Sequence, residues 1–102
     1  MTLITPLAAV PADIQSDITR AVAILKEGGC SAVFLFGSGA AGTFTDRSDL
    51  DLAVQGCPPE QFFRLLGRLL YELDRSVDLV DLDAPDPFAQ MLQREGGLQR
   101  VG

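Results

Sequence analysis

The feature that most constrains this chain is a Gly-Ser turn followed, at a short distance, by two aspartates. Phe36-Gly37-Ser38 ends an apolar segment, ten residues follow, and Asp49-Leu50-Asp51 opens the next apolar segment. Backbone N–H groups in such a turn can hold phosphates, and paired carboxylates can hold the divalent ions that phosphates carry. The combination predicts a site for a metal-bound nucleoside triphosphate.

The turn also resembles a different phosphate-binding pattern. Residues 37–42 spell Gly-x-Gly-x-x-Gly directly after a predicted strand, as in dinucleotide-binding units. Such a unit needs a crossover of about twelve or more residues, usually a helix, before its next strand. Only residues 43–49 separate the last glycine from the strand expected at 50–54, and Thr43, Asp46 and Ser48 favour a loop there. The spacing therefore argues against a dinucleotide-binding fold.

The two carboxylates stand on one side of a predicted strand. Asp49 and Asp51 are two residues apart, so both point to one face, with Cα atoms about 6.6 Å apart. Asp78 opens a later strand and could join them, whereas Asp81 should point to the opposite face. Hard oxygen ligands suit Mg²⁺, and a third carboxylate could complete a two-metal site or accept a proton from a hydroxyl. The chain has no histidine, so carboxylates with metal are the expected machinery.

Hydrophobic periodicity gives an order of helix, strand, turn, strand, helix, strand, helix. Gly67 interrupts the second helix, where we expect close packing, and we expect the Phe and Met side chains of the helices in the core. The predicted elements are helices at 11–27, 59–75 and 87–95, and strands at 32–36, 50–54 and 77–82. This is an α/β (α+β) pattern.

Length and charge limit the classes of function. The 102 residues suffice for one domain, 1–102, with its core at about 11–95, and 47% of them are hydrophobic. The net charge of −6 lies in residues 46–51 and 78–86, which suits cation binding and disfavours unaided binding to nucleic acid. No membrane span or signal peptide is expected. Cys30 and Cys57 are expected to be free thiols of a cytoplasmic protein.

The motif as a whole resembles the minimal nucleotidyltransferases of the DNA polymerase beta-like superfamily. Their pattern is Gly-Ser, ten residues, Asp-x-Asp and a later Asp, and Gly37, Ser38, Asp49, Asp51 and Asp78 match it in that order. The resemblance implies a three-stranded mixed sheet flanked by about four helices. It further implies that Gly37 and Ser38 bind the nucleotide, and that Asp49, Asp51 and Asp78 bind two Mg²⁺ ions and act in catalysis.

The resemblance also implies an activity and a partner. Stand-alone members of this size resemble antitoxins that transfer AMP from Mg-ATP to a tyrosine of a partner HEPN toxin. One departure stands in the turn, where Gly39 and Ala41 replace two arginines of many members; Arg47 or the partner could supply the missing charge. Two alternatives stay open: a module that neutralises its partner by binding alone, and transfer to a small molecule of the aminoglycoside type. The sequence leaves open whether two copies associate.

Overall fold

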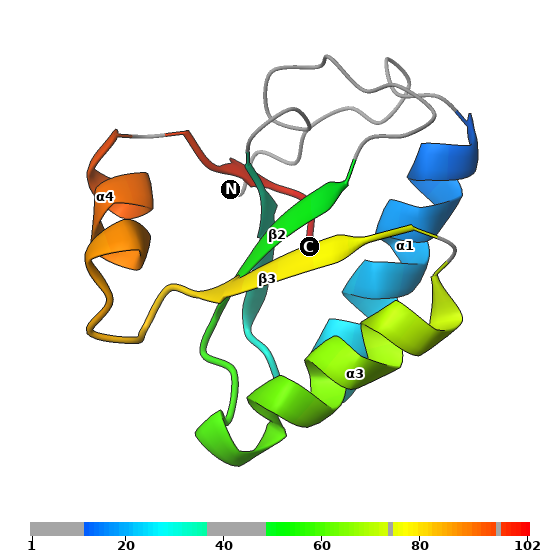
Figure 1. Ribbon diagram of the computed structural model, residues 1–102, viewed down its shortest axis with the longest axis horizontal. Helices are drawn as coiled ribbons and strands as arrows, with labels where there is room; N and C mark the ends of the chain where they lie inside the picture. The colour runs from blue at the N-terminus through cyan, green and yellow to red at the C-terminus, as the bar shows by residue number, and fades with distance from the viewer. Residues whose placement is uncertain (1–11, 37–48, 74, 96) are drawn as a thin grey trace.

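The structure is a computed structural model that describes residues 12–36, 49–73, 75–95 and 97–102 (Figure 1). Its elements are α1 (Ala12–Glu27), β1 (Ala32–Leu35), β2 (Leu50–Gln55), the short 3-10 helix η2 (Pro59–Gln61), α3 (Phe62–Glu72), β3 (Val77–Asp81), α4 (Pro87–Glu95) and β4 (Gln99–Arg100). The predicted strands and helices are confirmed, although the second predicted helix divides into η2 and α3 and ends three residues early, at Glu72.

The strands form one mixed sheet in the order β3-β2-β1-β4. β1 runs antiparallel to β2 and β4, whereas β2 and β3 are parallel and are connected through α3. The mixed sheet is confirmed, but the expected number of three strands is wrong, because β4 adds a fourth. β4 has only two residues, too few to show the alternation by which a strand is predicted.

Helices cover both faces of the sheet. α1 and α3 lie side by side on one face, and α4 lies apart from them on the other (Figure 1). Leu50, Leu52 and Val54 alternate along β2 and pack into the core under α1 and α3. Ala53 faces the other way and packs in a second, smaller cluster with Ala89 and Leu92 of α4. Asp51 shares the parity of Ala53, so it belongs to the α4 face.

Glycines end two elements where the backbone turns. Gly29 follows α1 with φ +101° and Gly56 follows β2 with φ +70°, both in the left-handed region that favours glycine. The Gly56 N–H also donates to Asp83 Oδ2 at 2.6 Å, which ties the end of β2 to the loop before α4. These contacts fix where β2 stops and the chain turns towards α3.

Several helical side chains lie outside the core, contrary to expectation. Phe63 is 79% exposed, Phe88 43% and Met91 36%. The helices bury only the face that meets the sheet, which for α4 is Ala89 and Leu92. A Cβ added at Gly67 would meet nothing within 4 Å, so the expected close packing there is also wrong.

The cysteines are free thiols, as expected. Cys30 and Cys57 are both buried within the α1/α3 core. Burial, followed by a hydrogen bond with Cys57, raises the pKa of the Cys30 thiol to about 12. Across the described parts of the chain, no helix is both long and apolar enough to span a bilayer.

Candidate active site

β2 positions the first two carboxylates. Leu50 and Leu52 are fully buried and fix the strand against the α1/α3 core. The intervening Asp51 therefore points to the opposite face, where it is only partly buried. Asp49 immediately precedes the strand and is exposed. The expectation that both carboxylates belong to one face agrees with this alternation.

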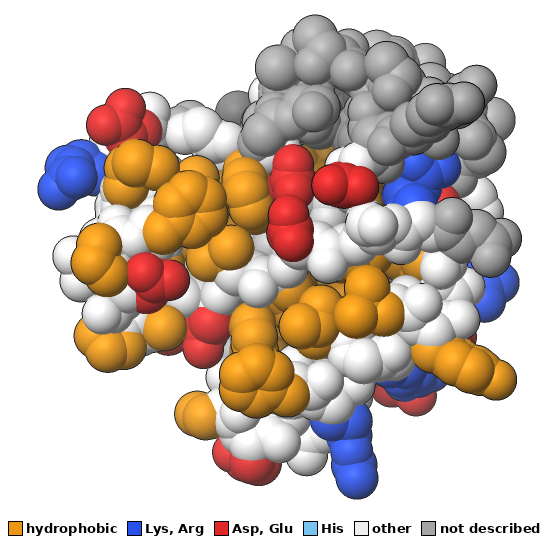
Figure 2. Space-filling view, viewed as in Figure 1, with side chains coloured by type: hydrophobic (Ala, Val, Ile, Leu, Met, Phe, Trp, Pro, Cys, Tyr) orange, Lys and Arg blue, Asp and Glu red, His pale blue; other side chains and the backbone are white. Residues whose placement is uncertain are grey.

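β3 brings the third carboxylate to the second. Asp78 is the register partner of Asp51 in the parallel β2–β3 pair, and the Leu50 N–H donates to the Ser76 carbonyl at 2.9 Å where the pairing begins. Neighbouring strands lie about 4.8 Å apart, and partners point to the same face. In Figure 2 acidic side chains gather over β2 and β3, at the edge of the grey residues. Asp81 has the opposite parity, as predicted. Its negative charge helps to raise the pKa of Cys30, which lies in the α1/α3 core.

The electrostatics show that the three carboxylates interact. The pKa of Asp51 is raised to about 6, first by burial, then by the charge of Asp78 and a hydrogen bond with it, and least by the charge of Asp49. Two carboxylates this close resist being ionised together unless a cation lies between them. Without a cation, Asp51 therefore keeps its proton to a higher pH than an ordinary aspartate does.

A divalent ion fits this donor set only in part. Within the described residues, His, Cys, Asp and Glu side chains form no group of three or more that could hold a metal ion by itself. Mg²⁺ commonly takes one or two carboxylates and completes its shell with water and substrate phosphates. The arrangement therefore fits an ion that arrives with a nucleotide better than an ion held by the protein alone.

The predicted phosphate turn lies outside the described residues. Gly37, Ser38, Gly39, Ala41 and Arg47 all fall within residues 37–48. The residue before the turn is described: the Phe36 N–H donates to the Asp51 carbonyl at 3.1 Å. The chain therefore leaves β1 for the predicted turn directly beside Asp51. β1 and β3, which carries Asp78, flank β2 on its two sides.

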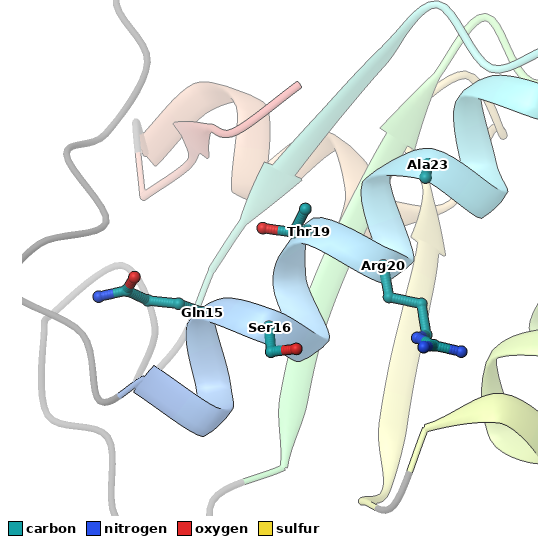
Figure 3. Close-up of a pocket in the computed structure, with 5 residues that line it drawn as sticks. All are labelled: Gln15, Ser16, Thr19, Arg20 and Ala23. Carbon is teal, nitrogen blue, oxygen red and sulfur yellow. The ribbon is translucent and has the colours of Figure 1, made fainter.

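A separate hollow lies on the outer side of α1 (Figure 3). Its described lining consists of Gln15, Ser16, Thr19, Arg20 and Ala23, all from that helix. α1 covers the face of the sheet opposite to Asp51. This hollow therefore takes no part in the carboxylate site.

Sequence reasoning missed the aromatic neighbours of the carboxylates. The ring of Phe88 meets that of Phe36 edge-on, with centroids 5.9 Å apart and planes at 68°. The sequence indicates Phe36 as the end of a buried strand and Phe88 as a core residue of a helix, and it gives no sign that the two rings meet. The mixed sheet sets Asp51 and Asp78, from two parallel strands, on one face, beside the end of β1 that leads into the predicted turn. This is the arrangement expected of the nucleotidyltransferase class.

Comparison with known families agrees with that class. Residues 19–98 match the family model described as polymerase beta, nucleotidyltransferase, and the chain belongs to this family. A comparison with functionally curated proteins gives no significant match.

Solved structures show the same fold. A toxin–antitoxin complex with AMP-PNP is 26% identical, with 83% of this chain and 72% of that chain covered and a TM-score of 0.66. An MntA–HepT toxin–antitoxin complex is 22% identical, with 86% and 71% covered and a TM-score of 0.62. A complex of a tri-AMPylated Shewanella oneidensis HEPN toxin with its MNT antitoxin has the same identity, coverage and TM-score. The last two, at this identity, support the fold alone.

Proposed function

We propose that this protein transfers AMP from ATP to a hydroxyl group of a partner protein. The observation that carries the proposal is the pairing of Asp51 with Asp78 across two parallel strands, with Asp49 close enough to raise the pKa of Asp51. Membership of the nucleotidyltransferase family supports transfer chemistry in general.

In this proposal Asp49 and Asp51 hold Mg²⁺ together with the phosphates of ATP, with Asp78 completing a site for two ions. When bound, the metal offsets the negative charge that develops on the phosphates. Gly37 and Ser38 hold the phosphates from the turn after Phe36. A cation held there would favour the ionised carboxylate of Asp51, whose pKa is otherwise raised by burial and by Asp78.

Asp78 acts on the acceptor. Its carboxylate accepts the proton of the acceptor hydroxyl while the oxygen attacks the α-phosphorus of ATP. A new phosphorus–oxygen bond forms to the acceptor, and the bond between the α-phosphorus and its bridging oxygen breaks. Pyrophosphate leaves with that electron pair. The exposed position of Asp78 beside Asp51 leaves it accessible to a protein side chain.

We extend the proposal to the partner: a HEPN-domain toxin whose tyrosine is the acceptor, with this protein as its cytoplasmic antitoxin. The support is the 26% identical structure, which is itself a toxin–antitoxin complex with a nucleotide analogue. The family resemblance of the Gly-Ser and Asp-x-Asp motif points the same way.

The test is transfer of label from ATP to a HEPN-domain protein encoded beside this one. We expect label from the α-phosphate, and none from the γ-phosphate, to appear on the partner in the presence of Mg²⁺. Asp49→Asn, Asp51→Asn and Asp78→Asn should each lower the rate at least about 100-fold. Asp86→Asn is the matched control, because its amide oxygen can still accept from the Phe88 N–H that Asp86 now caps.

Transfer of γ-label, or equal transfer by wild type and Asp78→Asn, would contradict the proposal.

A second candidate function is neutralisation of the partner by binding alone. It is favoured by Gly39 and Ala41, which stand where many related proteins have phosphate-binding arginines. In that case Asp49→Asn would still suppress the partner fully, and no label would transfer.

A further inference from the structure

α4 is anchored on one side and presents apolar side chains on the other. Ala89 and Leu92 are buried against the sheet, whereas Phe88 and Met91, three residues apart on the helix, are 43% and 36% exposed. The start of the helix is fixed, since Asp86 Oδ1 accepts from the Phe88 N–H at 3.1 Å and the Gln90 N–H donates to the Asp86 carbonyl at 3.0 Å. The backbone that carries the exposed Phe88 is therefore fixed at the start of α4.

This ring lies beside the carboxylate site. Phe36 belongs to the same cluster as Ala53 and Ala89, and its N–H donates to the Asp51 carbonyl. With one strand spacing from Asp51 to Phe36 and a further 5.9 Å between the two rings, Phe88 lies on the order of 10 Å from Asp51. Figure 2 shows apolar side chains gathered directly beside the acidic ones on this face.

From this juxtaposition we propose that Phe88, supported by Phe36 and Met91, is the platform on which the nucleobase of the bound nucleoside triphosphate stacks. The inference rests on the proposed function. Phe36 leads directly into the predicted phosphate turn, so the platform is on the nucleotide's side of Asp51. Asp78 lies on the same face but on the other flank of Asp51, in β3, and in this proposal the acceptor approaches from that flank.

The chemistry of the surface agrees with this occupant. A nucleobase offers a flat, apolar ring face, and Phe88 offers an exposed ring that is already in a T-shaped contact with Phe36. Such stacking is tolerant of base identity because every base has a π face. We therefore expect the platform to strengthen binding of any nucleoside triphosphate while leaving the phosphates to the carboxylate end of the site.

The test compares two ligands, ATP and inorganic tripolyphosphate, by equilibrium dialysis with the full chain in Mg²⁺. Wild type should bind ATP more tightly than tripolyphosphate. Phe88→Ala should weaken ATP binding about 10-fold or more and leave tripolyphosphate binding unchanged. Phe88→Leu, which keeps an apolar contact with Phe36 but has no ring, should show the same split, and Phe88→Tyr should keep the wild-type affinity.

Phe63→Ala is the matched control, because Phe63 is an even more exposed phenylalanine on α3, across the sheet from this surface. It should change neither affinity. Equal weakening of both ligands by Phe88→Ala, or none, overturns this inference alone. So does a Phe88→Ala protein that binds ATP normally but labels its partner poorly, which would assign the surface to the acceptor. Failure of wild type to bind either ligand overturns the proposed function and this inference with it.

Discussion

Asp51 illustrates how one side chain connects stability and chemistry. Its place in β2 is set by Leu50 and Leu52, which leave it on the α4 face of the sheet, partly buried beside Asp78. The strand alternation that fixes this face can be predicted from the sequence. The meeting with Asp78 cannot, because it depends on the register of two strands that are joined through α3. The raised pKa is the electrostatic result of that register.

This pKa predicts how the stability of the metal-free protein varies with pH. The folded chain holds the proton of Asp51 up to about pH 6, against an ordinary pKa of 3.8. The residue therefore stabilises the fold most below about pH 4, and this contribution is lost as the pH rises through 6. Asp51→Asn, which has no charge to lose, should be more stable than wild type by about 1 kcal/mol at pH 7.5, and no more stable below pH 4.

Urea unfolding in EDTA, repeated between pH 3.5 and 8, measures this difference. Excess Mg²⁺ provides a control, because a bound cation relieves the repulsion between the carboxylates. It should raise the free energy of unfolding of wild type at pH 7.5 and so reduce the difference from Asp51→Asn. A gap between the two proteins that stays constant over this pH range would show that Asp51 does not titrate in the folded state as described.

At the scale of the element, α3 is affected in opposite ways by two glycines, Gly67 within it and Gly28, which follows α1 and faces it. Gly67 lies in the middle of the helix with open space around it, whereas a Cβ at Gly28 would collide with the Leu65 side chain. Gly67→Ala should raise the free energy of unfolding by about 1 kcal/mol through helix propensity. Gly28→Ala should lower it, since Leu65 is buried and cannot move freely.

Chemical denaturation of the two variants beside wild type measures both changes. Circular dichroism at low denaturant concentration checks that the helix content of each variant is preserved. A destabilising Gly67→Ala substitution would mean that another molecule or segment packs against this face of α3.

The elements were largely predictable from sequence, but their contacts were not. The predicted bounds of α4, 87–95, agree with the structure because Pro87 and Gly96 mark its two ends. The sequence does not show which face of α3 packs against the sheet, because the adjacent Leu65 and Leu66 fit a helical apolar stripe about equally well. In the structure Leu65 is buried and Leu66 is only half-buried. The position of Phe88 was mistaken because hydrophobicity alone does not reveal where a short helix stops covering the sheet.

At the scale of the molecule, charge is divided between the two faces of the sheet. Ion pairs lie on the α1/α3 side: Arg20 Nη1 of α1 lies 3.8 Å from Glu72 Oε1 of α3, and Arg75 Nε, just after α3, lies 2.6 Å from Asp17 Oδ2 of α1. The interacting carboxylates Asp51 and Asp78 lie on the other face. This separation keeps the negative potential at the site, where it can attract a cation.

The last residues protect the edge of the sheet. Val33 of β1 accepts a hydrogen bond from Val101 at 2.8 Å and donates one to Gly102 at 3.1 Å. Deleting residues 99–102 should expose β1, an apolar strand, as an unpaired edge that pairs with other molecules. Light scattering should show more association than in the full chain, whereas Arg100→Lys, which keeps the backbone, should behave as wild type. An unchanged scattering signal after the deletion would contradict this role.

The parallel pairing of β2 with β3 has a consequence for biogenesis. Asp51 and Asp78 are 27 positions apart in the chain, and their meeting requires the whole crossover through α3. Contacts of this separation form later than local ones during folding, because a longer loop must close first. A nascent chain emerging from the ribosome therefore lacks an assembled carboxylate pair until β3 has been synthesised and docked, so its chemistry should begin only after that step.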